Sequence, residues 1–323
     1  MTIPLIPQEI YLLERYSSLD YFGQMRDHFA QCVKAAEDAL AEFMRHLPPD
    51  YRSRPLHQQP DAVWGERVIP NMQWALKTLN GAYINLSHGD LWGLGCAGNV
   101  ETTFVSINRD YDIYWMPQPY QSRYDEAQIL ASEMASNISH TEQGSWSYGT
   151  LSFAYHEPSR GPLNPPASWP VYRINPALQV RSGEKVPRTG IYLPAEGPAA
   201  AALLIEGQRA IEAKVCTNAE DLLRDPDGTM PQSRREPTVW TLVERVADEG
   251  GDNPMPAAGE AALRLKCEAG QPCPRTGWWF TPAKANSRRH FQAGQLMPDL
   301  HADWGDTIWQ WDPHQGDGDQ RAG

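Results

Sequence analysis

Apolar residues recur at steps of three and four along residues 22–47, which is the period of one face of an α-helix. The stripe consists of Phe22, Met25, Phe29, Cys32, Ala36, Leu40, Phe43 and Leu47. Ser18 with Asp20 is typical of a helix start, and Pro48 with Pro49 ends the pattern. The sequence therefore predicts a long amphipathic helix in this part of the chain.

Two shorter stripes with the same period follow, and each predicts a further helix. One starts just after Pro70, since proline is tolerated in a first helical turn; its members are Met72, Ala75, Leu76, Leu79 and Tyr83. The other starts at Ser122 with Asp125, which is similar to a capping box. Its members are Ala127, Leu130, Ala131, Met134 and Ile138. Residues 84–117 show no clear period, and residues 8–140 as a whole are interpreted as a helical bundle.

Proline becomes frequent after the predicted helices, at positions 158, 162, 165, 166, 170 and 176. Such density excludes a long helix and favours an extended, stiff connector. We therefore expect a helical N-terminal domain at 1–156 and a connector at 157–180. A tandem-repeat domain is expected at 181–312, and residues 313–323, rich in Gly and Asp, are expected to be disordered.

The C-terminal half contains a degenerate internal repeat. Gly183-Glu-Lys-Val-Pro-Arg-Thr-Gly-Ile-Tyr-Leu-Pro194 recurs as Gly270-Gln-Pro-Cys-Pro-Arg-Thr-Gly-Trp-Trp-Phe-Thr-Pro282. At one offset, identical residues also stand at the pairs Gly207/Gly294 and Gln208/Gln295. These identities, within a window of about 26 residues, indicate a duplicated module with units at about 183–243 and 270–312. The shared residues are turn and packing residues, so the repeat is interpreted as a scaffold.

Each unit is expected to follow the same order of elements. Pro-Arg-Thr-Gly predicts a tight turn, in which Gly190 and Gly277 supply a positive φ. An aromatic strand follows, and then a short helix that Ser287 caps in the second unit and that ends at Gly207 or Gly294. A β-like segment closes each unit, at 238–240 and 307–309. The predicted fold class is α+β: an N-terminal helical bundle followed by a β-rich C-terminal domain containing a degenerate tandem repeat.

The first unit carries about 18 residues that the second lacks, roughly between Cys216 and Arg235. Extra loop length in one copy of a duplicated scaffold is a natural place for a specific function. The insertion is acidic, and its candidate partner-binding residues are Glu220, Asp221, Asp225 and Asp227.

Charge and cysteine content narrow the class of protein. The formal net charge of −12 disfavours binding to a phosphate backbone and favours a cationic partner. Five widely spread cysteines do not make a disulfide framework and fit a reducing compartment. The N-terminus lacks the pattern of a signal peptide, and no apolar run is long enough to span a membrane. A cytoplasmic protein without membrane contact is therefore expected.

The sequence contains only partial matches to motifs for nucleotide binding, nucleophilic catalysis and zinc binding. Gly93-Leu-Gly-Cys-Ala-Gly98 matches a dinucleotide-binding fingerprint in letters, but no βαβ pattern surrounds it. Ser145-Trp-Ser-Tyr-Gly149 lacks the first glycine of a nucleophile elbow and is interpreted as a loop. The histidines form no zinc-binding pair, and Cys273 stands where the first unit has Val186, which favours a packing role. We therefore expect no catalytic residues, no metal and no cofactor.

Basic and aromatic residues permit two interpretations each. The pairs Arg234-Arg235 and Arg288-Arg289 favour a salt-bridged surface over direct contact with nucleic acid. The tryptophans of the second unit either stack on sugar rings or fill small β-rich cores, and the recurrence of Trp240 as Trp309 favours cores.

Several of these residues resemble a known family. Cys273-Pro-Arg-Thr-Gly-Trp-Trp-Phe-Thr-Pro-Ala283, Ser287-Arg-Arg-His-Phe291, Gly294, Met297-Pro298 and Thr307-Ile-Trp-Gln-Trp-Asp312 resemble the C-terminal signature of immunity protein families 71 and 72. Tyr11-Leu-Leu-Glu-Arg-Tyr-Ser-Ser18 before a long helix is similar to their start. Gln295-Leu296 departs from the Glu that many relatives have before Met-Pro.

These families belong to bacterial polymorphic toxin systems, many of them associated with type VI secretion. The resemblance implies a non-enzymatic immunity protein that binds and neutralises a cognate toxin by stoichiometric protein–protein interaction. The toxin is expected to be a basic protein acting in the cytoplasm. Two alternatives stay open: an adaptor or glycan-binding protein that uses the Trp-rich tandem module, and an enzyme with an unfamiliar site.

Overall fold

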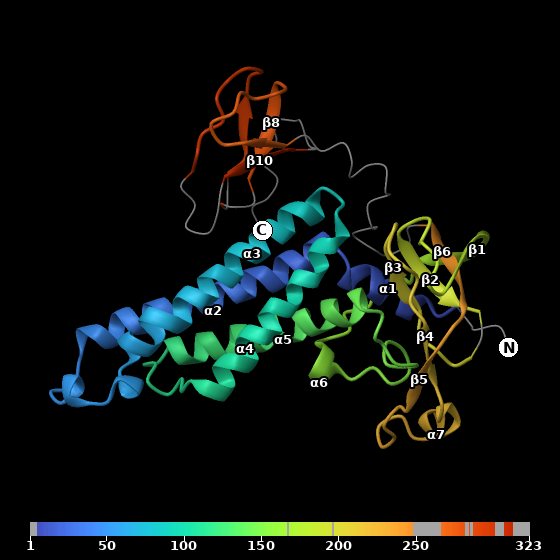
Figure 1. The fold of residues 1–323 in the computed structure, drawn as a ribbon, viewed down its shortest axis with the longest axis horizontal. Helices are drawn as coiled ribbons and strands as arrows, with labels where there is room; N and C mark the ends of the chain where they lie inside the picture. The colour runs from blue at the N-terminus through green and yellow to red at the C-terminus, as the bar shows by residue number, and fades with distance from the viewer. Residues whose placement is uncertain are drawn as a thin grey trace.

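The computed structural model describes residues 5–166, 168–195, 197–247, 266–281, 284, 287–300 and 307–312. The fold is α+β, with helices in the N-terminal half and antiparallel sheets in the C-terminal region (Figure 1). The predicted fold class is confirmed. The expectation of a disordered tail at 313–323 lies outside the described residues.

The helical half consists of α1 (Pro7–Tyr16), α2 (Leu19–Arg45), η1 (Tyr51–Ser53), η2 (Leu56–Gln58), η3 (Asp61–Val68), α3 (Ile69–Ser87), η4 (Leu91–Ala97), α4 (Gly98–Asp110), α5 (Tyr120–Glu142) and α6 (Glu157–Arg160). Helix α2 confirms the first prediction. Ser18 is its N-cap, because the Ser18 hydroxyl accepts a hydrogen bond from the Tyr21 amide at 3.1 Å. The helix ends at Arg45, before the two prolines.

The start of the second predicted helix is confirmed, whereas the third begins slightly earlier than predicted. Pro70 lies in the first turn of α3, but the chain is already helical before it, in the π-helical segment η3. Helix α5 begins at Tyr120 rather than at Ser122, whose hydroxyl donates to the side chain of Gln118 instead of capping the helix. Leu130, a member of the third stripe, is exposed.

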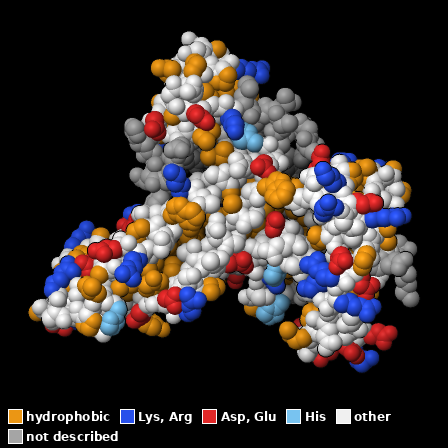
Figure 2. All heavy atoms as spheres, viewed as in Figure 1, with side chains coloured by type: hydrophobic (Ala, Val, Ile, Leu, Met, Phe, Trp, Pro, Cys, Tyr) orange, Lys and Arg blue, Asp and Glu red, His pale blue; other side chains and the backbone are white. Residues whose placement is uncertain are grey.

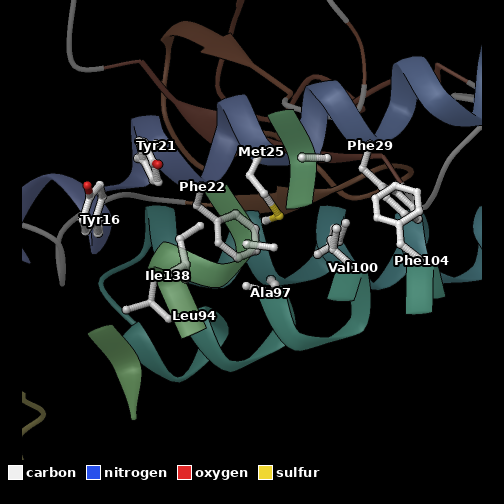
Figure 3. Packing of buried hydrophobic residues seen from close by; sticks show 14 of the residues in the cluster. Tyr16, Tyr21, Phe22, Met25, Phe29, Leu94, Ala97, Val100, Phe104 and Ile138 are labelled. Atoms are coloured by element: carbon white, nitrogen blue, oxygen red, sulfur yellow. The ribbon is translucent and has the colours of Figure 1, made fainter. Parts of the chain in front are cut away.

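The apolar stripes meet in one core. Figure 3 shows side chains of α2, η4, α4 and α5 converging between the helices. Phe29 of α2 packs on Phe104 of α4 with ring centroids 5.3 Å apart. Residues 84–117, which the sequence left unassigned, supply part of this core through Leu94 and Val100. Gly93 is needed for the packing, because a Cβ there would lie 2.8 Å from the Ala82 carbonyl oxygen.

The strands form two four-stranded antiparallel sheets with equivalent strand orders, β1-β6-β2-β3 and β7-β10-β8-β9. The first sheet contains β1 (Val171–Arg181), β2 (Gly190–Pro194), β3 (Ala202–Leu204) and β6 (Val239–Ala247). The second contains β7 (Lys266–Glu268), β8 (Gly277–Phe280), β9 (Arg289–Phe291) and β10 (Ile308–Trp311). The two units therefore share one topology, as the repeat predicted.

The hydrogen bonds of the repeated motif also recur. The amide of Gly183 donates to the Ala210 carbonyl at 2.7 Å, and the amide of Gly270 donates to the Met297 carbonyl at 2.8 Å. The indole of Trp240 donates to the Ile211 carbonyl, as that of Trp309 does to the Pro298 carbonyl. The shared residues therefore hold equivalent turns and cores, which confirms their role as scaffold.

Two details of the predicted unit are wrong. No helix follows β2 or precedes Gly294 in the described residues; β3 and β9 stand in its place. The positive φ values occur at Gly207 and Gly294, in turns, rather than at Gly190. Gly190 is required for a different reason, because a Cβ there would lie 2.5 Å from Leu242 Cδ1. Gly277 does have a positive φ, of 153°.

The predicted connector at 157–180 is shorter in the structure. Helix α6 and strand β1 occupy its two ends, so both units begin one strand earlier than the repeated motif. Pro176 lies in β1 where the pairing register with β6 shifts between Asn175 and Gln179. Proline is tolerated there because a bulged residue donates no ladder hydrogen bond.

The two units differ in how they meet the helices. One face of the first sheet, with Ile191 and Leu193 of β2, joins the core of the helical bundle. Its other face packs around Tyr192 and Trp240 in a core of its own. The second unit has a separate small core around Trp279 and Trp309. The first unit is therefore continuous with the bundle, so the predicted boundary at 156 does not separate two cores.

Candidate functional site

The acidic insertion forms a projecting arm on the first unit. The arm consists of β4 (Ala213–Cys216), α7 (Ala219–Arg224), the loop after α7 and β5 (Ser233–Glu236). Strands β4 and β5 pair antiparallel from Ala213↔Glu236 to Cys216↔Ser233. In Figure 1 the arm points away from the helical bundle. The second unit has no counterpart of the arm among its described residues.

Local hydrogen bonds fix the base of this arm. The Asn218 side chain accepts from the Gln232 amide at 2.8 Å and donates to the Met230 carbonyl at 3.1 Å, which joins the two ends of the loop. Leu222 of α7 is 1% exposed, so this short helix buries an apolar side chain. The acidic residues are therefore carried by an ordered support.

The four candidate residues all lie on this arm and are all exposed, as Figure 2 shows for its tip. Glu220 and Asp221 stand in the first turn of α7. Asp225 Oδ1 accepts from the Gly228 amide at 3.1 Å, and Asp227 lies in the same turn. Among these four acids, Asp221 has an ion pair, with Arg224 at 3.4 Å, while Arg234 of β5 pairs with Glu236. The tip of the arm therefore presents a net negative charge to solvent.

Two apolar residues that the sequence does not single out lie on the same arm. The side chains of Leu223 and Met230 are 54% and 83% exposed, beside the carboxylates. Acidic residues around exposed apolar side chains fit a protein partner, because partners gain affinity from apolar burial and association rate from charge. The signal was present in the sequence as apolar residues inside an acidic insertion, but only the structure shows that they are exposed.

The motifs set aside in the sequence have structural roles. Gly93–Gly98 forms η4 and the start of α4, and it follows a helix rather than a strand. Val186 and Cys273 are each 2% exposed and lie in the cores of their units. Trp279 and Trp309 are fully buried, which leaves their faces inaccessible to a sugar. Trp304 lies outside the described residues.

Within the described residues, no group of three His, Cys, Asp or Glu side chains is placed to hold a metal ion. A hollow of about 510 Å³ is lined by the consecutive residues Asn108–Tyr114, which include no histidine. No described helix is both long and apolar enough to cross a membrane.

No protein-family model, curated protein or solved structure matches this chain.

Proposed function

We propose that this chain is an immunity protein that binds and neutralises a cognate bacterial toxin by stoichiometric protein–protein interaction in the cytoplasm. The observation that carries the proposal is the acidic arm, an exposed and copy-specific insertion on a duplicated scaffold. The resemblance of the second unit to the signature of immunity protein families 71 and 72 supports the same function. The protein acts by occupying the toxin rather than by turnover.

The arm suits a basic partner. Toxins that attack nucleic acids carry positively charged clefts, because their substrates are polyanions. The carboxylates at the arm tip attract such a surface over a distance of about one Debye length, ~8–10 Å at physiological salt. Leu223 and Met230 then supply apolar area for the bound complex.

The proposal is tested with the product of the gene adjacent to the one that encodes this chain. Tagged full-length protein should co-purify with that product, and its co-expression should restore growth of cells that the product inhibits. If the adjacent product neither binds nor is toxic, and no other toxin gene lies nearby, the proposed function is wrong.

The alternative of a glycan-binding module is supported less well. Stacking on sugars needs exposed aromatic faces, whereas the recurrent tryptophans Trp240 and Trp309 lie in the cores. Trp278 is half-buried and is covered by the Arg288 guanidinium, whose Cζ lies 4.1 Å from the ring centroid. A lack of fluorescence change on titration with oligosaccharides is the expected result.

A further inference from the structure

Three basic side chains converge on the turn that follows α5. His140 lies in the last turn of α5, and its Nδ1 is 3.2 Å from the hydroxyl of Ser145. Lys214 of β4 donates from Nζ to the Ser145 carbonyl at 2.9 Å. Arg160, at the end of α6, lies beside the same turn. The three groups come from three elements that are far apart in the sequence.

Trp146 forms the floor of this cluster. The Cζ of Arg160 lies 4.7 Å from the centroid of the Trp146 ring, and the imidazole of His140 meets that ring edge-on at 5.1 Å. Trp146 is 3% exposed, and its indole nitrogen donates to Thr141 Oγ1 at 3.0 Å. A buried and hydrogen-bonded ring therefore fixes the positions of two of the three basic groups.

The positive charge of the cluster is not balanced by a carboxylate. Arg160, His140 and Lys214 are each half-buried, and none has an ion pair with a described residue. By contrast, the shielded Arg245 pairs with Glu14 at 3.2 Å. Unpaired cations at a half-buried site lose solvation without a compensating partner.

Burial and neighbouring positive charge lower the pKa values of His140 and Lys214. Burial lowers the pKa of His140, and the charges of Arg160 and Lys214 lower it further. Burial also lowers the pKa of Lys214, to which Arg235 of β5 adds repulsion. The groups that face the imidazole from α6 and β4 are thus both cationic, and an anion at this point would relieve the repulsion among them.

The turn at Gly144, after α5, places the basic cluster between the helical bundle and the first sheet. Gly144 has a φ of 55°, and a Cβ there would lie 2.2 Å from Ile211 Cδ1, so the turn is pressed against the first unit. The cluster therefore lies where the bundle meets the sheet, and ligand sites often lie at such junctions. Figure 2 shows histidine and basic side chains beside the notch between the bundle and the arm.

We propose that His140, Arg160, Lys214 and the Ser145 hydroxyl form a binding site for a tetrahedral oxyanion of the phosphate class, as a free ion or as a phosphate monoester. Guanidinium, ammonium and hydroxyl donors in one place are the groups that bind such oxyanions in proteins. The guanidinium of Arg160 supplies paired N–H donors in one plane, and the ammonium of Lys214 supplies a localised positive charge. Lys214 lies on β4 of the arm, but the site includes none of the arm's acidic residues and does not depend on the proposed partner.

The test is calorimetric titration of the full-length protein with sulfate at constant ionic strength, because sulfate stays dianionic between pH 5.5 and 8.5. Saturable binding of one ion per chain is expected. Arg160→Gln and Lys214→Gln should each weaken binding by about tenfold, the usual size for one charge-assisted hydrogen bond. The control Arg109→Gln, an exposed arginine paired with Asp110 on α4, should leave binding unchanged.

The pH dependence of sulfate affinity distinguishes a specific binding site from nonspecific ionic screening. Anion binding favours the imidazolium of His140, so sulfate affinity should rise as the pH falls from 8 to 5.5. His140→Gln should abolish this dependence while Lys214→Gln retains it. Circular dichroism of each variant checks that the fold is intact.

Titration with inorganic phosphate and with phosphoserine distinguishes the two sources. Tighter binding of phosphoserine assigns the site to a monoester, and equal or tighter binding of phosphate assigns it to the free ion. The absence of saturable sulfate and phosphate binding, or equal weakening in Arg109→Gln, would overturn the proposal.

Discussion

At the scale of single residues, buried polar groups join the helices to the first sheet. Glu9 of α1 is 7% exposed, and its carboxylate accepts from the Ala201 amide at 3.0 Å. Burial raises the pKa of Glu9 to about 7, and the hydrogen bond from Ala201 opposes the rise. Glu14, also on α1, accepts from the Tyr172 hydroxyl at 2.7 Å and pairs with Arg245. Helix α1 is thus tied to the sheet by carboxylates as well as by packing.

Glu9 makes stability depend on pH. Its pKa in the folded chain is about 7 and its ordinary value is 4.5, so the folded state binds this proton more tightly than the unfolded state. The contribution is fully present below about pH 4.5 and is lost as the pH rises through about 7. The shift corresponds to about 3 kcal/mol. Glu9→Gln, which mimics the protonated form, should therefore be more stable than the parent at pH 8.

Urea unfolding at pH 5 and pH 8 measures this effect. The difference in free energy of unfolding between Glu9→Gln and the parent should be positive at pH 8 and small at pH 5. Glu126→Gln, at an exposed position of α5, serves as the control and should show no such difference between the two pH values. A Glu9→Gln variant that is less stable at pH 8 would contradict the account.

At the scale of elements, the repeated Pro-Arg-Thr-Gly turn is held by the aromatic residue two positions after its glycine. The Tyr192 hydroxyl donates to the Arg188 carbonyl at 2.6 Å. In the second unit, Trp279 Nε1 donates to the equivalent Arg275 carbonyl at 3.0 Å. Different aromatic side chains therefore satisfy the same backbone oxygen in both units.

Tyr192→Phe removes this donor without opening a cavity. The Arg188 carbonyl loses the partner of a part-buried hydrogen bond, so the free energy of unfolding should fall by about 1 kcal/mol. Urea denaturation measures the change. Tyr114→Phe, at a side chain that is 82% exposed, is the matched control and should be neutral. Equal effects of the two substitutions would show that the hydroxyl of Tyr192 does not hold the turn.

The sequence predicts local features better than it predicts contacts between distant segments. The α2 stripe and Ser18 were sufficient to define that helix, because its cap and its period are both local. The repeat revealed two equivalent units, but β3 and β9 are short strands that resemble loops in sequence, so a helix was expected instead. The role of Gly190 depends on Leu242, a neighbour from another strand that no local pattern reveals.

The same difference between local and long-range features applies to the functional sites. The acidic arm could be predicted because its residues are consecutive and only one unit carries them. The cluster of His140, Arg160 and Lys214 had no sequence signal, because its members come from α5, α6 and β4. Packing of α6 on α5 brings Arg160 to His140, and packing of the Gly144 turn on the first unit brings Lys214 to them.

At the scale of the whole molecule, the two copies of one module are attached differently. The face that carries Ile191 and Leu193 in the first unit carries Trp278 and Phe280 in the second. The second unit instead contacts α3 through a polar pair, in which the Ser87 hydroxyl donates to Gln310 Oε1 at 3.0 Å. Polar contact supplies less stabilisation than apolar burial. The second unit should therefore unfold more independently of the helices than the first unit does.

This difference predicts unequal effects of core truncation. Leu203→Ala opens the core that the first sheet shares with the helices, so it should lower the stability of the helices by about 3 kcal/mol. Met297→Ala opens the core of the second unit alone. It should shift the tryptophan fluorescence transition while the helical circular dichroism transition stays in place. A helical transition that moves equally in both variants would contradict separate cores.

The acidic arm should act at long range on association with the partner. Changing Glu220, Asp221, Asp225 and Asp227 to the corresponding amides removes four negative charges from the tip. Stopped-flow association with the partner should slow by about tenfold at low salt, and its salt dependence should flatten, with a smaller change in the dissociation rate. Amide substitution at the exposed acids Asp20, Asp27, Glu66 and Glu126 is the control of equal charge. Unchanged kinetics would remove the arm from the binding surface.

The most direct test of the proposed function is a titration of the product of the adjacent gene, the proposed toxin, with this protein, followed by measurement of the activity of that product. The account predicts that activity falls linearly and reaches zero at one chain per toxin molecule, without covalent change in either protein. Undiminished activity at excess, or complete inactivation of the toxin by a small fraction of an equivalent, would contradict neutralisation by stoichiometric binding.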